Sequence, residues 1–238
     1  MLFIILLECS IELVPSELTA LKPIQKHAGR RKKKPTELLL DQSYHGMVMP
    51  RLEEHERRGR PDIVFLSLHT LLETPLCKQG GLQLYLHLRD GRIVYVNSQV
   101  RIPRNQERFV GLLEQLLVVG RVPPHGDSLL EVTDHTLPSL ISDLEAKHSR
   151  VKSFIAVEDG ESTTFDGLVE LYPSDPKEHV VFGVGAFPHG DFSPSVIQLF
   201  EKKLCLDVDV MMAWHVCAEI LWSYSKKHTV TKNRHATE

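Results

Sequence analysis

The chain contains few cysteines and none of the compact motifs that bind metals or nucleotides. Its four cysteines, Cys9, Cys77, Cys205 and Cys217, include no CxxC pair, and its thirteen histidines show no metal-ligand spacing. A zinc site and a disulfide framework are therefore disfavoured, and reduced, mostly buried thiols are expected. Neither a P-loop nor a GxGxxG fingerprint occurs, which argues against an unrelated nucleotide-dependent α/β enzyme.

Long hydrophobic runs are also missing. No apolar stretch approaches the ~20 residues that a membrane-spanning helix needs. The apolar segment 1–7 has no basic n-region, meets Glu8 at once and is followed by no small-residue cleavage site. It therefore predicts a buried first strand instead of a signal peptide, and we expect a cytoplasmic protein without membrane contact.

The charges nearly balance, with 28 Lys and Arg against 31 Asp and Glu, for a net charge of −3. This excludes a histone-like binder of bulk polyanions, so any contact with nucleic acid has to come from a local basic patch. Residues 22–35 concentrate positive charge with little apolar periodicity. They predict an exposed basic loop, either a solvated segment or an arm that contacts phosphates. With 42% apolar residues, the chain is expected to build one α/β domain over residues 1–238.

Three arginines, Arg101, Arg104 and Arg108, lie within eight residues where a loop enters a helix. The helix is predicted over residues 105–119, because apolar residues recur at helical spacing, Asn105 suits the N-cap and a glycine follows the last turn. Planar guanidinium groups pair well with phosphate oxygens, so the segment is interpreted as a clamp for a polyanion. The alternative is a solvated helix start.

A fourth arginine precedes another predicted helix. Pro61 suits the first helical position of an apolar pattern that continues to Leu72, and Asp62 falls at the positive end of the helix dipole. A local pair with Arg60 is the simplest interpretation of this aspartate. The functional alternative makes Arg60 part of the same basic face as the clamp.

Between these two predicted helices, apolar and polar residues alternate. The alternation predicts a β-hairpin over 82–88 and 93–96, with its turn at 89–92. The hairpin leads the chain into the arginine segment. A loop at 121–127, rich in proline and glycine, is expected to separate this part from the last third of the chain.

The last third alternates strands and helices. Strands are predicted at 153–157, 179–184 and 204–206, with a weak helix at 165–171 and a mostly buried one that carries Met211, Trp214, Ala218, Leu221 and Trp222. Successive strands that end in ligand-sized loops place a small-molecule site at the carboxyl edge of a sheet. The glycine-rich loop after residue 183 brings backbone amides toward such a site. The polar tail at 226–238 is expected to be frayed.

From about residue 38 to 225, the chain resembles the archaeal and eukaryotic small-subunit rRNA pseudouridine N1-specific methyltransferases of the SPOUT superfamily. The resemblance rests on Arg60-Pro61-Asp62, on Arg101-Ile102-Pro103-Arg104 with Arg108-Phe109, and on Val184-Gly185-Ala186 followed by Gly190. It implies an α/β sheet of SPOUT type with a C-terminal trefoil knot at 150–225, and a hairpin and helix at 78–120 that extend the fold for RNA binding. It also implies S-adenosylmethionine as cofactor and a homodimer.

The resemblance assigns roles to individual residues. Gly185 and Gly190 match the first cofactor loop, and Val157 and Glu158 match a weaker third contact. The second cofactor loop corresponds to Leu204, Cys205, Leu206, Asp207, Val208, Asp209, Val210 and Met211, although relatives usually carry proline and a small hydroxyl residue there. The RNA-facing positions correspond to Arg60, Asp62, Arg101, Arg104 and Arg108.

The implied reaction methylates N1 of a pseudouridine, which has to lose its proton. Glu73 and Asp62 both match acidic positions and are alternative proton acceptors, while Arg60 or Arg101 stabilises charge on the base. Small-subunit rRNA and other ribosome-assembly components are the expected partners. The competing hypothesis is a non-catalytic assembly factor that binds the same rRNA on the same fold.

Overall fold

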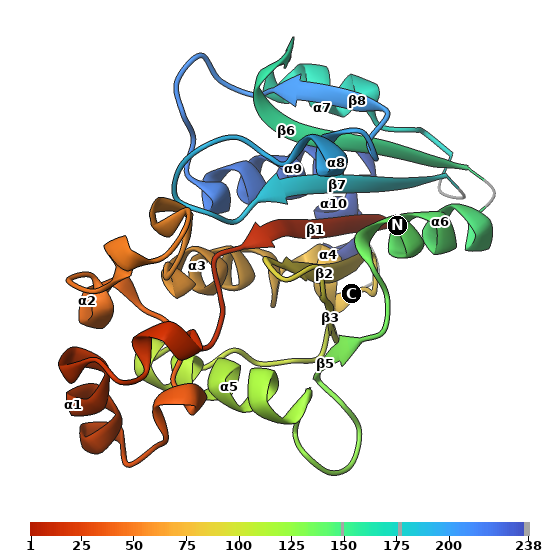
Figure 1. The fold of residues 1–238 in the computed structure, drawn as a ribbon. Coiled ribbons are helices and arrows are strands. Elements are labelled where there is room, and N and C mark those ends of the chain that lie inside the picture. Colours follow the sequence, from red (N-terminus) through yellow and green to blue (C-terminus); the bar gives the residue numbers. More distant parts are fainter. Residues whose placement is uncertain (149, 176–177, 236–238) are drawn as a thin grey trace.

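A mixed sheet of eight strands runs through the molecule in the computed structural model, which describes residues 1–148, 150–175 and 178–235 (Figure 1). The strand order is β4-β5-β3-β2-β1-β7-β6-β8, and β2, β1, β7, β6 and β8 run parallel. The strands are β1 (Leu2–Cys9), β2 (Leu82–Leu88), β3 (Ile93–Val96), β4 (Arg121–Val122), β5 (Leu130–Thr133), β6 (Val151–Ser162), β7 (His179–Gly185) and β8 (Lys202–Cys205).

Strand β1 lies in the middle of the sheet, which confirms the prediction of a buried first strand. Its parallel neighbours are β2 on one side and β7 on the other. Leu2, Ile4 and Leu6 join the core on one face of the sheet, and the alternate residues join the core on the other face. An apolar run without alternation suits this position, because helices cover both faces of a parallel sheet.

Helices pack on both faces of the sheet. The residues of α3, α5 and α9 join the larger core, and those of α6 and α8 join the second. The helices are α1 (Lys22–Arg31), α2 (Gln42–His45), α3 (Pro61–Leu71), α4 (Pro75–Lys78), α5 (Gln106–Val119), α6 (Leu137–Lys147), α7 (Phe165–Leu171), α8 (Pro194–Ile197), α9 (Ala213–Lys227) and α10 (Val230–His235). Among the described residues, no helix is both long and apolar enough to cross a bilayer.

Most local predictions are confirmed. Helix α5 begins after Asn105, whose side chain accepts a hydrogen bond from the backbone N–H of Arg108, and α3 begins at Pro61. Strands β2 and β3 form the predicted antiparallel hairpin. All four cysteines are free and all but Cys205 are buried.

One prediction about domain organisation needs correction. The loop at 121–127 does not separate two parts, because β4 pairs with β5, which in turn pairs with β3. The hairpin of β2 and β3 forms as predicted and belongs to the main sheet, because β2 pairs with the central strand β1. Turn residues report local chain reversal, whereas sheet membership depends on partners far away in the sequence.

The prediction that residues 22–35 form an exposed loop is also wrong. Residues Lys22–Arg31 form α1, whose buried side chains Ile24 and Ala28 join a small separate core built from residues 14–52. Pro23 in the first turn favours a helix start, and Ile24 and Ala28 have helical spacing. The high density of charge concealed this short apolar face.

The C-terminal tail is also more ordered than expected. Helix α9 continues to Lys227, and α10 follows with Val230 buried in the larger core. Residues 236–238 of the predicted frayed tail lie outside the described residues. Of the side chains predicted for the buried face of α9, Leu221 is buried, whereas Trp222 is 45% exposed.

Two buried histidines join α1 to α2. His27 Nδ1 and His45 Nε2 lie 2.8 Å apart, and His45 Nδ1 accepts a hydrogen bond of 3.1 Å from the backbone N–H of Asp41. Burial and the neighbouring His27 lower the pKa of His45 to about 4. Burial, with Arg30 and Arg31 nearby, also lowers the pKa of His27. Both imidazoles are therefore neutral in the folded protein at pH 7.

Stability is expected to fall as the pH decreases from 6.5 toward the folded pKa of His45 at about 4. The unfolded chain takes up protons in this range while the folded imidazole does not, so the stabilisation is complete only above the unfolded pKa. Urea unfolding at several pH values would show a shallower dependence for His45→Gln than for a control, His125→Gln, at an exposed position. Equal slopes for the two variants would contradict this account.

Candidate cofactor and RNA site

The parallel strands β1, β7, β6 and β8 end at the same edge of the sheet, on the left in Figure 1. Loops follow β7 at 186–193 and β8 at 206–212, and β6 carries an irregularity in its pairing with β8 between Ala156 and Glu161. The three segments matched to cofactor contacts therefore lie at one edge, as the strand pattern predicted. Sheets of this kind bind ligands at this edge.

Strands β6 and β8 approach each other closely at Gly160. A Cβ atom there would lie 2.6 Å from the backbone carbonyl carbon of Leu204, so only glycine fits. The contact brings the part of β6 that contains Val157 and Glu158 next to the start of the second loop. The Leu204 side chain is fully buried, so this residue has only its backbone to offer a ligand.

The second loop, residues 206–212, exposes apolar side chains and backbone amides. Val208 is 97% exposed and Val210 is 77% exposed, which is unusual for valine. Among the described residues, no hydrogen bond reaches the backbone N–H groups of Leu206, Val208 or Val210, whereas that of Asp209 donates to Asp207 Oδ1. The loop thus offers free donors beside apolar surface, which suits a nucleoside ligand.

The first loop, residues 186–193, depends on two glycines. A Cβ atom on Gly185 would come within 3.0 Å of the Phe192 ring and 3.2 Å of the Phe187 ring. Gly190 has a φ of +86°, in the left-handed region that favours glycine. These constraints give a physical reason for both glycines.

Glu8 and Arg57 hold this first loop in place, and sequence reasoning missed both roles. Glu8, at a φ of 49°, accepts hydrogen bonds from Arg57 Nη2 at 2.9 Å and from the N–H and hydroxyl of Ser193. The Arg57 guanidinium also lies 4.2 Å from the centre of the Phe187 ring and donates to the carbonyl of Asp191. No sequence signal connects residues so far apart, so only the folded chain reveals this network.

Arg60 and Asp62 form the predicted local pair. Arg60 Nε and Nη2 donate to the two Asp62 oxygens at 2.8 and 2.7 Å, and this hydrogen bonding raises the pKa of Arg60. The backbone N–H of Arg60 lies 3.0 Å from Ser10 Oγ, and the Ser10 N–H donates to the carbonyl of Ala186 at 2.9 Å. The pair therefore lies directly beside the first loop.

The arginine clamp, defined as Arg101, Arg104 and Arg108, is exposed around the start of α5. Among the described residues, no carboxylate lies within salt-bridge distance of these guanidinium groups. Arg101 and Arg104 line a hollow of about 420 Å³ together with Glu73 and Lys78. Unpaired cations around a hollow suit a bound anion, so this geometry favours the clamp over a neutralised helix start.

The two candidate proton acceptors do not lie together. Asp62 is in the first turn of α3, whereas Glu73 follows the end of α3 with a left-handed φ of 61°. The helix between them separates the residues by about 15 Å. The structure therefore groups Asp62 with Arg60 and the first loop, and it groups Glu73 with Arg101 and Arg104.

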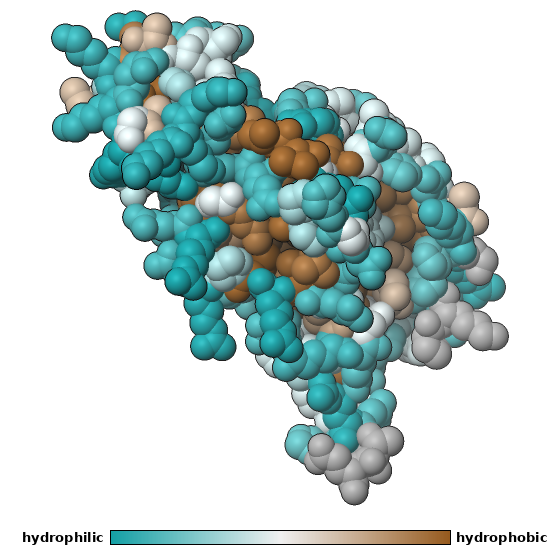
Figure 2. Space-filling model, turned by 90° about the horizontal axis from the view of Figure 1, so that it is seen from below, coloured by the Kyte–Doolittle hydropathy of each residue, from teal (hydrophilic) through white to brown (hydrophobic). Residues whose placement is uncertain are grey.

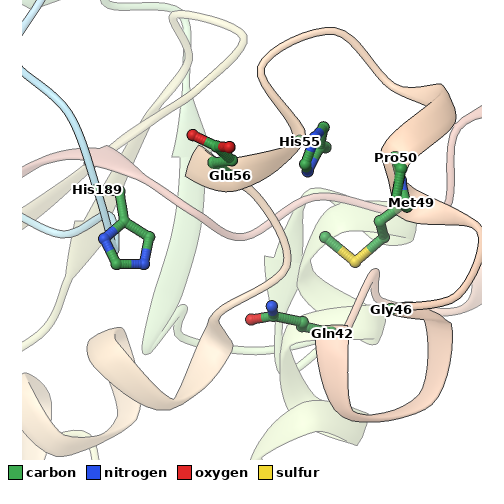
Figure 3. A pocket seen from close by; sticks show the side chains of 7 residues that line it. All are labelled: Gln42, Gly46, Met49, Pro50, His55, Glu56 and His189. Atoms are coloured by element: carbon green, nitrogen blue, oxygen red, sulfur yellow. The ribbon is translucent and has the colours of Figure 1, made fainter.

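A second hollow, of about 470 Å³, lies between the first loop and residues 42–56 (Figure 3). His189 comes from the loop, and the other lining side chains come from the small core region: Gln42, Gly46, Met49, Pro50, His55 and Glu56. The hollow places polar side chains beside the first loop, and no sequence pattern predicted it.

Comparison with known proteins matches nearly the whole chain. Residues 4–225 match the family model described as EMG1/NEP1 methyltransferase. The ribosomal RNA small subunit methyltransferase Nep1 of Staphylothermus marinus is 41% identical over 219 residues, which are 92% of each chain. That of Thermococcus sibiricus is 40% identical over 94% of this chain and 97% of its own. The crystal structure of Archaeoglobus fulgidus Nep1 bound to S-adenosylhomocysteine superposes with a TM-score of 0.81 at 32% identity, covering 95% of this chain and 98% of the other.

Proposed function

The chain belongs to the EMG1/NEP1 methyltransferase family, and from this premise we propose that it methylates N1 of a pseudouridine in small-subunit ribosomal RNA. The relatives are small-subunit rRNA methyltransferases by name, and the structural neighbour holds S-adenosylhomocysteine, the product of S-adenosylmethionine-dependent methyl transfer. This chain is accordingly an S-adenosylmethionine-dependent rRNA methyltransferase. The placement of Arg60 and Asp62 beside the first cofactor loop is the observation that supports N1 of pseudouridine as the methyl acceptor.

The residues at the sheet edge fit S-adenosylmethionine. Glycine at positions 160 and 185 lets backbone come close to backbone and to aromatic rings, and Gly190 supplies a left-handed turn. The loop after β8 offers backbone donors beside exposed apolar side chains. An adenosine ring needs both kinds of contact. We assign to the cofactor Gly185 and Gly190, residues 204–211, and Val157 with Glu158. The trefoil knot expected at 150–225 is part of the same proposal, supported by the pairing of β8 with β6.

The positions of Asp62 and Glu73 support a homodimer. Within one chain, α3 separates Glu73 from Asp62 and the first loop. The second loop also exposes Val208, Val210 and Met212, an apolar surface that a second copy would cover. In this arrangement, the target base enters the cofactor site of one protomer, and the partner contributes Glu73 to that site.

The reaction forms an N1–carbon bond as the carbon–sulfur bond breaks, and N1 gives up its proton. S-adenosylmethionine, when bound, supplies an electrophilic methyl group on a sulfonium. As N1 loses its proton, negative charge spreads to the ring carbonyl oxygens, and Arg60 is placed to stabilise it. Asp62 holds the Arg60 guanidinium with both oxygens. Because both Asp62 oxygens already bind Arg60, we assign Asp62 to positioning Arg60 and Glu73 to accepting the proton.

Methyl transfer from labelled S-adenosylmethionine is expected only to an RNA loop that carries pseudouridine at the target, and not to the matched loop with uridine. In uridine, N1 bears the ribose and has no proton to lose, so the acceptor atom is missing. Transfer to both RNAs would contradict N1 of pseudouridine as the methyl acceptor. Tight RNA binding without transfer to either RNA would favour the non-catalytic assembly factor. A separate measurement tests the cofactor site: if S-adenosylmethionine raises the temperature of thermal unfolding, the protein binds the cofactor.

A further inference from the structure

We propose that the exposed face of α1 is a second contact surface for the RNA phosphate backbone, outside the arginine clamp. The surface consists of Lys22, Lys26 and Arg30, here named the α1 stripe. This inference rests on the proposed function in one respect, namely that the RNA is the substrate of this enzyme.

The α1 stripe has the geometry of a linear phosphate site. Its three residues are four positions apart, so they lie along one side of the helix at intervals of about 6 Å. All three are exposed, while Ile24 and Ala28 on the other side are buried. An extended polyanion running along the helix would meet one cation after another.

The charges of the α1 stripe are not balanced locally. Helix α1 contains no acidic residue, and among the described residues no salt bridge involves Lys22, Lys26 or Arg30. Like charges four residues apart repel each other and weaken a helix, so an ordinary solvated helix gains by pairing them with acids. The chain as a whole has a net charge of −3, so general basicity does not explain the stripe. Bound phosphates would relieve this repulsion.

A buried carboxylate fastens the end of α1 to α5, the helix that begins at the clamp. Glu114, 1% exposed, accepts from Arg31 Nη2 at 2.9 Å, from Lys33 Nζ at 2.6 Å and from the backbone N–H of Leu39 at 3.1 Å. Glu114 lies six residues after Arg108, or about 9 Å along α5. The α1 stripe is therefore held at a set distance from the clamp, so that one RNA can reach both.

An exposed aromatic ring beside the α1 stripe favours RNA as the partner. Tyr44 is 41% exposed, the Arg30 guanidinium lies 5.1 Å from its ring centre, and the His27 ring supports it from 4.4 Å. Cations next to an exposed aromatic ring are typical of surfaces that bind single-stranded RNA, where the ring stacks on a base. The end of the molecule that carries α1 is also largely hydrophilic, at the left in Figure 2.

The test compares two RNAs and two triple variants. The first RNA contains only the target loop, and the second adds flanking single-stranded nucleotides on both sides. The stripe variant is Lys22→Gln/Lys26→Gln/Arg30→Gln, and its matched control is Lys147→Gln/Lys152→Gln/Lys232→Gln, which removes the same charge from exposed positions on α6, β6 and α10. Affinity is measured by fluorescence anisotropy over a range of salt concentrations.

The stripe variant is expected to bind the long RNA on the order of tenfold more weakly at 0.1 M salt, with a salt slope smaller by about 2, because three phosphate contacts are lost. Its affinity for the short RNA should match that of the unmodified protein. Tyr44→Leu should weaken binding of the long RNA without changing the salt slope, since stacking releases no counterions. Equal losses in the stripe and control variants, or no loss on the long RNA, would overturn the inference.

Methyl transfer to the short RNA separates this inference from the proposed function. The stripe variant should methylate the short RNA at the unmodified rate, because the α1 stripe lies outside the cofactor site and the clamp. If no variant methylates any RNA but the selective loss on the long RNA persists, the stripe stands and the proposed activity fails. If methylation is intact and the salt slope on the long RNA is unchanged, only the stripe fails.

Discussion

A mixed dimer of one Asp62→Asn protomer and one Glu73→Gln protomer is expected to regain methyl transfer that each variant alone has largely lost. Each single variant should slow single-turnover transfer by on the order of 100-fold, because Asp62→Asn loses the support of Arg60 and Glu73→Gln loses the proposed proton acceptor. If each active site takes Asp62 from one protomer and Glu73 from its partner, the mixed dimer contains one intact site and one doubly altered site. It should then reach half of the unmodified activity.

The reverse combination provides the control. A dimer of an unmodified protomer with a doubly substituted one contains two sites with one alteration each, so its transfer should stay slow. An active site within one chain predicts the opposite pattern, because the unmodified protomer would keep its own site. Two different affinity tags allow each mixed dimer to be purified before the rates are compared. The geometry behind the expectation is the separation of about 15 Å along α3 between the two carboxylates.

Replacing the arginine clamp with glutamine at all three positions is expected to weaken RNA binding by on the order of 100-fold at 0.1 M salt, and to reduce the salt slope by about 2. Arg101, Arg104 and Arg108 are exposed and meet no carboxylate among the described residues, so the fold should tolerate their loss. Unlike the α1 stripe, the clamp should matter equally for the short and the long RNA, because it holds the target loop itself.

A lysine version of the clamp distinguishes charge from geometry. With lysine at the three positions, the salt slope should return, because the same number of counterions is released. The affinity should recover only in part, because an ammonium group lacks the planar fork that pairs with two phosphate oxygens. An affinity in the glutamine variant equal to that of the Lys147, Lys152 and Lys232 control would show that the clamp does not contact RNA.

Local chemistry was sufficient to predict most of the helices and strands and the Arg60–Asp62 pair in the candidate site. Asn105 and Pro61 mark helix starts, because N-capping and the fixed φ of proline act within one helical turn. The alternation of apolar and polar residues in 82–88 marks a strand. The same reasoning identified the Arg60–Asp62 pair, because a long arginine side chain just before a helix can reach a carboxylate in its first turn. Successive strands in the last third placed the two candidate cofactor loops at one edge, because parallel strands share their direction.

Contacts between distant residues, in contrast, required the folded chain. Glu8 meets Arg57 and Ser193, and Glu114 meets Arg31 and Lys33, over separations that no periodicity reports. The second contact also explains why residues 22–35 were mistaken for a loop: their charges are partly neutralised by one buried carboxylate on another helix. The distance between Asp62 and Glu73, in contrast, follows from the predicted helix alone, because the two residues lie at its opposite ends. Side-chain chemistry and short-range geometry are encoded locally, whereas the pairing of charges and the grouping of site residues depend on how the core packs.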